Sequence, residues 1–145
     1  MIHRHMNLRF THMSSTTTIS VRVSSSEIDD LGHVNNARFL DYFERGRRHW
    51  YNQHTPTLSA DAGVVAGTVV VNINVNFRRE CFAQEVLSVT TRPQRRGGRS
   101  FVFDQEIFNE AGEAVADASV TNVLMDMGTR EVIALPDSLA RHFDS

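Results

Sequence analysis

One change of hydrophobic period, near Pro56, constrains the fold of this chain more than any other feature. Before it, over residues 36–53, apolar side chains recur at helical spacing and form one face of an amphipathic helix. The members of that stripe are Phe39, Phe43, Gly46 and Trp50. After it, over residues 69–77, apolar residues alternate with asparagines, which is typical of a β-strand with one apolar and one largely polar face. The sequence therefore predicts a long helix that ends before a sheet begins.

The remaining strands complete a single α+β domain. A first strand is expected around residues 19–23, and the others at residues 85–95, 99–109 and 114–126. Glycine-containing turns separate the last three strands, and a short terminal helix is expected from Pro136. We expect one domain over residues 18–145, with five antiparallel strands, because the chain has 145 residues and no repeat or linker divides it.

Residues 1–17 are predicted to form a flexible arm outside this domain. Residues 14–18 are a hydroxyl-rich run without apolar residues to bury. His3, His5 and His12 are the histidines of the arm, and no cysteine or carboxylate pattern accompanies them. We therefore expect no metal site.

Composition excludes several classes of protein. No stretch approaches the roughly 20 apolar residues that a membrane helix needs, and the N-terminus lacks the apolar centre of a secretory signal, so no membrane insertion is expected. Cys81 is the only cysteine, which favours a reducing, cytoplasmic location. The formal net charge of −2 argues against a nucleic-acid partner.

The predicted architecture also favours self-association. One amphipathic helix cannot cover both faces of five strands, and an exposed strand edge needs a partner. We expect a homo-oligomer, either a homodimer or a homotetramer.

The residues that carry chemistry are concentrated directly before the long helix. Residues 27–36 contain three carboxylates, one histidine and two asparagines. The free N–H groups at a helix N-terminus favour developing negative charge, so a thioester carbonyl placed there would be polarised. A nearby carboxylate can attack the carbonyl or activate water. Aspartate and asparagine before a helix also serve as caps and turn formers, and spacing alone leaves both roles open.

The same residues resemble a known family. The pattern Asp29-x-x-Gly32-His33-Val34-Asn35-Asn36, followed by Phe39, Tyr42, Glu44 and Arg47, is similar to the signature of the 4-hydroxybenzoyl-CoA thioesterase-like branch of hotdog-fold proteins. The likeness continues at Val75-Asn76-Phe77-Arg78, Gly98-Arg99-Ser100-Phe101, Asp126 and Leu135-Pro136. It implies a hotdog fold, in which the sheet wraps around a long central helix.

The resemblance also implies roles for individual residues. Asp29 matches the catalytic aspartate of the family, as nucleophile or general base. His33 matches a residue that orients the thioester or water, with a purely structural role in the loop as the alternative. The backbone N–H near Asn36 takes the place that polarises the carbonyl. Asn35 is a helix cap or a substrate contact, and Glu44 is either an alternative reactive carboxylate or an ion-pair partner of Arg47 or Arg48.

A compact group of arginines suits a polyanionic ligand. Arg95, Arg96 and Arg99 flank Gly97-Gly98, and planar guanidinium groups bind phosphates well. They are candidates for binding coenzyme A, with ordinary solvated turn charges as the alternative. Arg78 and Arg79 are further candidates, for the ligand or for a subunit contact.

The predicted function is hydrolysis of an acyl-CoA thioester to free acid and coenzyme A, with no cofactor. The alternatives are a thioesterase acting on acyl carrier protein and a non-catalytic acyl-CoA-binding hotdog protein. Cys81 is a poor candidate nucleophile, since it follows a strand and has no histidine beside it in sequence. No Gly-x-Ser-x-Gly motif suggests a serine hydrolase.

Overall fold

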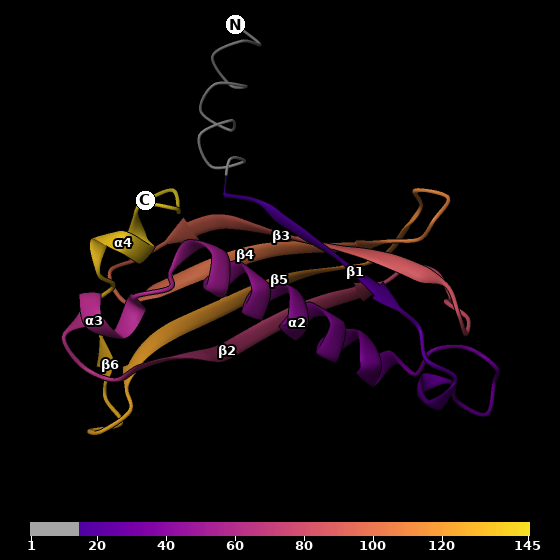
Figure 1. The fold of residues 1–145 in the computed structure, drawn as a ribbon, viewed down its shortest axis with the longest axis horizontal. Helices are drawn as coiled ribbons and strands as arrows, with labels where there is room; N and C mark the ends of the chain where they lie inside the picture. The colour runs from indigo at the N-terminus through magenta and orange to yellow at the C-terminus, as the bar shows by residue number, and fades with distance from the viewer. Residues whose placement is uncertain (1–14) are drawn as a thin grey trace, which may run out of the picture.

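A long helix lies across one face of a curved antiparallel sheet in the computed structural model, which describes residues 15–145 (Figure 1). Helix α2 spans Asn36–His54 and extends the predicted helix by one residue. Its buried face contains the predicted stripe and two further side chains, those of Tyr42 and Arg47: Phe39, Tyr42, Phe43, Gly46, Arg47 and Trp50. The predicted α+β class and central helix are confirmed.

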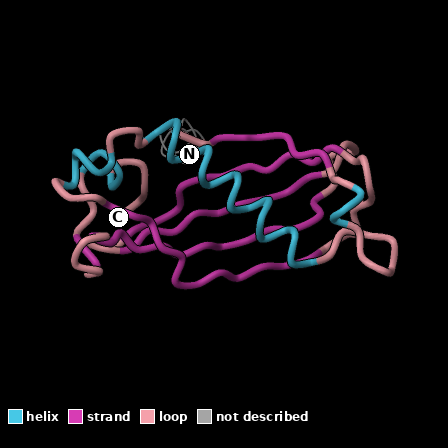
Figure 2. The backbone as a smooth tube through the Cα atoms, turned by 60° about the horizontal axis from the view of Figure 1, so that its bottom comes forward, coloured by secondary structure: helices cyan, strands magenta, loops and turns pink. Residues whose placement is uncertain are grey.

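The sheet contains β1 (Thr17–Arg22), β2 (Ala66–Phe77), β3 (Val86–Arg96), β4 (Ser100–Phe108), β5 (Ala114–Asp126) and β6 (Val132–Ile133). The first five lie in the order β1-β3-β4-β5-β2, all pairs are antiparallel, and β6 pairs with β5. Figure 2 shows α2 crossing these strands obliquely. α2 packs chiefly on β1 and β3, and its backbone does not approach β2 as closely. Only side chains therefore extend into the space between the C-terminal half of α2 and β2.

Several short elements were absent from the sequence prediction. The sheet has six strands rather than five, because the chain turns back after Asp126 through a hydrogen bond from its N–H to Glu131 O (2.9 Å). The 3₁₀ helix η1 (Ser25–Glu27) and helix α3 (Leu58–Ala62) lie on either side of α2 in sequence. The predicted terminal helix is α4 (Asp137–Ala140), with Pro136 as its N-cap. Elements of two to five residues are too short to display a period.

The predicted faces of β2 were partly wrong. A β-bulge at Val71 interrupts the register with β5, since Val70 pairs with Asn122 and Asn72 with Thr121. Ile73 packs on the core under α2, as the alternation predicts. Before the bulge, the even-numbered residues of the strand face the helix instead of the odd-numbered ones. Thr68 and Val70 therefore lie on the helix side, beside Asn122. One extra residue in a strand exchanges its two faces.

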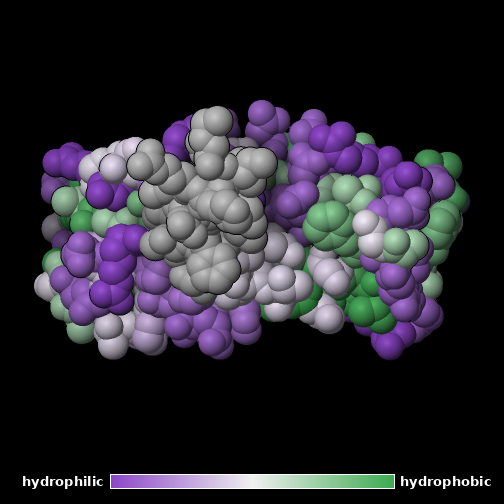
Figure 3. All heavy atoms as spheres, turned by 90° about the horizontal axis from the view of Figure 1, so that it is seen from above, coloured by the Kyte–Doolittle hydropathy of each residue, from purple (hydrophilic) through white to green (hydrophobic). Residues whose placement is uncertain are grey.

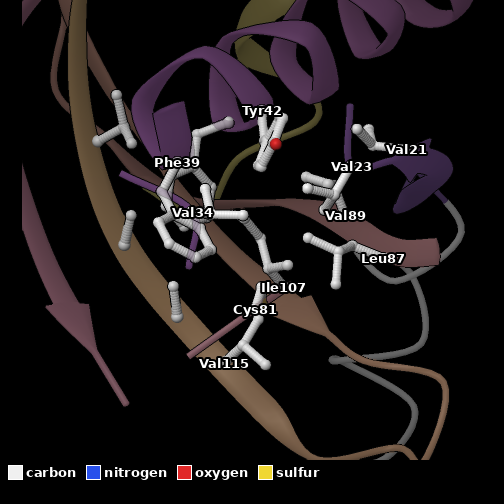
Figure 4. Packing of buried hydrophobic residues seen from close by; sticks show 14 residues of the cluster. Val21, Val23, Val34, Phe39, Tyr42, Cys81, Leu87, Val89, Ile107 and Val115 are labelled. Carbon is white, nitrogen blue, oxygen red and sulfur yellow. The ribbon is translucent and has the colours of Figure 1, made fainter. Parts of the chain in front are cut away.

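The core has two parts, one under each half of α2. Under the N-terminal half, Phe39 and Tyr42 point from the helix toward residues of the sheet such as Ile107 and Val115 (Figure 4). Under the C-terminal half, an aromatic cluster packs against α4; it comprises Trp50, Phe101, Phe103, Leu139 and Phe143. The first part supports the loop before α2, where the candidate site lies.

The predicted arm, residues 1–17, lies largely outside the described residues, and so do His3, His5 and His12. The part from Ser15 onward belongs to the domain. Ser15 is buried, and its carbonyl oxygen accepts a hydrogen bond of 2.6 Å from the indole Nε1 of Trp50. β1 then begins at Thr17.

Gly46 lies where α2 packs tightly against the sheet, as its place in the apolar stripe suggests. A Cβ atom at this position would lie 2.8 Å from Thr91 Oγ1 and 2.9 Å from Val89 Cγ1. Both neighbours are β-branched side chains with little freedom to move. Glycine is therefore required for the helix to pack at this distance.

We expect Gly46→Ala to lower the free energy of unfolding by about 1–2 kcal/mol. Overpacking a tight contact costs about 1–3 kcal/mol, while alanine recovers up to about 1 kcal/mol of helix propensity. Urea denaturation of the two proteins measures the difference. Gly63→Ala is the contrasting variant, because alanine at this position would be strained by the positive φ of 75° and not by close packing. An unchanged midpoint for Gly46→Ala would contradict the packing argument.

β2 forms one edge of the sheet and exposes apolar side chains, including Val70, Val71 and Phe77. An exposed edge of this kind favours pairing with a second copy, and the homo-oligomer stays a prediction. Across residues 15–145, none of the helices combines the length and the apolar character that crossing a membrane would require.

Candidate active site

The loop between β1 and α2 is held in place at its start by a capping box. The backbone N–H of Ser24 donates to Glu27 Oε1 (2.9 Å), and Ser24 Oγ accepts from the N–H of Ser26 (3.3 Å). Glu27 is buried, and its carbonyl oxygen accepts from the N–H of Asn35 (3.2 Å). Glu27 thus ties the two ends of the loop together, and its carboxylate is occupied by this structural role.

Asp29 and His33 form the ends of a tight turn within this loop. The N–H of Asp29 donates to His33 O (2.9 Å), and the N–H of Gly32 donates to Asp29 O (3.0 Å). Gly32 adopts a φ of +86°, which favours glycine. One carboxylate oxygen of Asp29 accepts from the N–H of Leu31 (2.9 Å). The other lies 3.9 Å from His33 Nδ1, so the turn sets the orientation of the carboxylate toward the imidazole.

His33 lies between two carboxylates. Its Nδ1 atom is within 3.9 Å of Asp29 Oδ2 and 3.2 Å of the Val34 carbonyl oxygen, and its Nε2 atom is 3.7 Å from Glu80 Oε1. Glu80 comes from the segment after β2, which the hydrogen bond from the N–H of Val34 to Cys81 O (2.8 Å) holds against the loop. The imidazole therefore has an acidic group on each side, an arrangement that suits proton transfer.

Asn35 and Asn36 form the N-terminus of α2. Asn35 is the N-cap, and its side-chain oxygen accepts from the N–H of Ala37 (2.9 Å), which confirms the capping role. Arg38 N–H donates to Asn35 O (2.9 Å). The N–H of Asn36 has no hydrogen-bond partner within residues 15–145 and is available to a ligand. It also lies at the positive end of a 19-residue helix.

A pocket of about 240 Å³ opens at this helix end. Residues of the loop, the helix and the end of β2 line it: His33, Asn36, Phe39, Phe77, Arg78 and Glu80. In Figure 3 hydrophobic surface is exposed among hydrophilic side chains at the end of the molecule that carries the loop. Phe77, which lines the pocket, is about half exposed. The pocket thus combines a polar wall with apolar surface.

The site brings together most of the predicted catalytic residues. His33 and Asn36 line the pocket, and Asp29 lies behind His33 without lining it. A carbonyl oxygen placed at the N–H of Asn36 would be polarised by that donor and by the helix dipole. The Asp29–His33 pair can take up or deliver a proton beside it.

The arginines divide between the two ends of the domain. Arg78, which forms an ion pair with Asp117, and Arg79, which lies 3.3 Å from Glu113, line the pocket. Arg95, Arg96 and Arg99 lie at the β3–β4 turn. The N–H of Arg96 donates to Asp144 O (2.8 Å) beside α4, at the opposite end of α2 from the pocket. Within one protomer, this turn and Asp29 do not form one site.

Two other candidates have structural explanations. Glu44 lies 3.2 Å from Arg48 Nη2, which confirms the predicted ion pair. Cys81 is fully buried, and burial raises the pKa of its thiol to about 12, so the reactive thiolate is suppressed. Glu80 was missed as a site residue, because only the return of β2 to the start of α2 brings it to His33.

Comparison with known proteins identifies the family. A model of the thioesterase-like superfamily matches residues 23–143. The chain belongs to this superfamily. Its relatives include the long-chain acyl-CoA thioesterase FadM of Escherichia coli K12, which is 35% identical over 120 residues, or 82% of this chain and 90% of FadM. The acyl-CoA thioester hydrolase YbgC of Escherichia coli O157:H7 is 27% identical over 123 residues, covering 85% of this chain and 92% of YbgC.

Solved structures agree with this assignment. A probable thioesterase from Bartonella henselae superposes with a TM-score of 0.71 at 26% identity, covering 83% of this thioesterase and 98% of the other chain. The predicted resemblance to hotdog-fold thioesterases, and with it the hydrolase class, is confirmed.

Proposed function

We propose that this thioesterase hydrolyses acyl-CoA thioesters to the free acid and coenzyme A, with Asp29 as the reactive carboxylate. The observation that carries the proposal is the N–H of Asn36 at the start of α2: it has no hydrogen-bond partner within residues 15–145, and Asn36 lines the same pocket as His33. FadM and YbgC, whose names specify acyl-CoA substrates, support the choice of carrier. Asp29, His33 and Asn36 are therefore assigned as the catalytic residues.

The position of Asp29 favours general-base catalysis over direct attack. Its carboxylate lies behind His33, and one of its oxygens is engaged by the N–H of Leu31. In the proposed reaction, a water molecule gives a proton to the Asp29–His33 pair while its oxygen bonds to the thioester carbon. The N–H of Asn36 stabilises the resulting oxyanion. When the C–S bond breaks, the proton passes to the thiolate and coenzyme A leaves as the thiol.

The proposal includes a homo-oligomer that pairs through β2. Antiparallel pairing of this edge with a second copy reverses the direction of the partner. The end of the partner that carries Arg95, Arg96 and Arg99 then lies toward the end of this protomer that carries the pocket. This arrangement would allow the arginine turn to bind the phosphates of coenzyme A together with Arg78, although the two lie apart in one chain.

The function is tested by thiol release from acyl-CoAs with short, long and aromatic acyl groups. We expect hydrolysis of at least one of them with a kcat/KM of roughly 10⁴ M⁻¹s⁻¹ or more, the lower end of the usual range for enzymes. Absence of hydrolysis across the panel would contradict the proposal. Assay of the same acyl groups on acyl carrier protein would then separate a carrier-protein thioesterase from a non-catalytic binder.

A further inference from the structure

A second pocket, of about 180 Å³, lies between the C-terminal half of α2 and β2. Glu44, Arg47 and Tyr51 line it from the helix, and Thr68, Val70 and Asn122 from the sheet. The bulge at Val71 is what turns Thr68 and Val70 toward this pocket. The candidate active site at the start of α2 does not use any of these residues.

Arg47 lines this pocket and forms no salt bridge within residues 15–145; Glu44, whose charge acts on it, is paired with Arg48. The exposed fraction of Arg47 is 8%, and its only hydrogen bond within residues 15–145 runs from Nη1 to Gln105 Oε1 (2.9 Å). Arg45 and Arg48, by contrast, lie 3.3 Å from Asp41 and 3.2 Å from Glu44. A guanidinium has five N–H donors, so most of the hydrogen-bonding capacity of Arg47 is unused. Buried arginines are usually paired with a carboxylate.

The surroundings of Arg47 are fixed in place. The side-chain amide of Gln105 donates to Phe43 O (2.9 Å) and to Thr91 Oγ1 (2.8 Å), which aims its oxygen at the guanidinium. The hydroxyl of Tyr51 is buried close to Thr68. It makes no hydrogen bond of normal geometry with any residue in the described part of the chain. Burial raises the pKa of Tyr51, so this hydroxyl stays protonated and can donate a hydrogen bond to a ligand.

The two pockets lie on the same side of the helix. Asn36, Leu40, Arg47 and Tyr51 follow one another at spacings of four, seven and four residues and share one stripe of α2. Leu40 is partly exposed between the two polar ends. Asn36 and Arg47 are 11 positions apart, or roughly 16 Å along the axis. An extended chain that advances roughly 1.2 Å per bond covers that distance in roughly 13 bonds.

We propose that the Arg47 pocket binds a carboxylate at the far end of the acyl chain, so that the preferred substrates are long acyl-CoAs with a terminal carboxyl group. The inference rests on the proposed function, because the thioester must lie at Asn36. The terminal carboxylate accepts hydrogen bonds from the guanidinium of Arg47 and the hydroxyl of Tyr51. The ion pair between Glu44 and Arg48 lies at the same pocket and offsets the charge of Glu44.

The test compares tetradecanoyl-CoA with its ω-carboxylated counterpart, tetradecanedioyl-CoA. We expect the wild type to prefer the carboxylated chain in kcat/KM. Arg47→Met is expected to lower the ratio of the two kcat/KM values by roughly 10- to 100-fold, the loss typical of a hydrogen bond to a charged group. Arg47→Lys restores part of the ratio, since it keeps the charge but not the planar fork. Tyr51→Phe, which removes one hydroxyl, also lowers the ratio and guards against a folding defect at Arg47.

Arg45→Met is the matched control, because Arg45 pairs with Asp41 away from the pocket, and it leaves the ratio unchanged. Equal hydrolysis of the two substrates by the wild type would overturn the inference and leave the proposed function intact. That result is also expected if a carboxylate of a partner subunit occupies Arg47. Retention of the wild-type ratio in both Arg47→Met and Tyr51→Phe would overturn it too. No hydrolysis of any acyl-CoA would overturn the proposed function and this inference together.

Discussion

Asp29→Asn is expected to lower kcat by roughly 100- to 10,000-fold, the contribution typical of a general base. The asparagine side chain keeps an oxygen that can accept from the N–H of Leu31, so the turn before α2 is preserved. What it loses is the ability to take a proton from water beside His33. Steady-state thiol release with the preferred acyl-CoA measures the effect, and KM is expected to change little.

Asp30→Asn is the matched control for this prediction. Asp30 is the next residue in the same loop, is exposed, and does not line the pocket. It removes the same charge from the same segment, and we expect a kcat within about twofold of the wild type, because an exposed charge beside the site is largely screened. Full activity in Asp29→Asn would refute the assignment. Glu80, which lies 3.7 Å from His33 Nε2 and lines the pocket, would then be the next carboxylate to replace.

Asn36→Pro is expected to lower kcat by roughly 100- to 1,000-fold while leaving the helix intact. Proline has no backbone N–H, so the substitution deletes the donor assigned to the oxyanion, and loss of one such donor typically costs this much. Position 36 is the first residue of α2, where proline is well tolerated. Asn35 has a φ of −61° and a ψ of 133°, the extended conformation that a following proline prefers.

The comparison variant at this position is Asn36→Ala, which removes the side chain but keeps the N–H. We expect it to retain most of the wild-type kcat, so that the pair of substitutions separates the backbone donor from the side-chain amide. Thermal unfolding of both variants checks that α2 still forms. If the proline and alanine variants have equal rates, the N–H of Asn36 is not the oxyanion donor.

The parts of the fold that could be predicted are those with a long period. The spacing of Phe39, Phe43 and Trp50, with Asn35 before the stripe and Pro56 after it, located α2 to within one residue at its end. The bounds of the three long strands after β2 were similarly close. The bulge at Val71 could not be predicted, because with three consecutive valines at positions 69–71 either face of the strand could be the buried one. β6 has two residues and no pattern of its own.

The site shows the same division between local and distant information. Asp29, His33, Asn35 and Asn36 are neighbours in sequence, so a motif was enough to place them at one helix end. Glu80 joins them only through the pairing of β2 with β5 and the contact between Val34 and Cys81. Arg47 was visible in the sequence as part of a helix. Its burial without a salt bridge to the described residues depends on which strand it faces, and this cannot be read from the sequence.

The aromatic cluster around Trp50 has a practical value for all of these experiments. Trp50 is the only tryptophan of the chain and is fully buried. Its indole N–H donates a hydrogen bond to the carbonyl oxygen of Ser15, at the end of the domain away from the Asn36 pocket. Its fluorescence therefore reports on the folded state of every variant without interference from substitutions at Asp29 or Asn36. A protein with a natural optical probe at one end and its chemistry at the other allows loss of rate to be separated from loss of structure in a single cuvette.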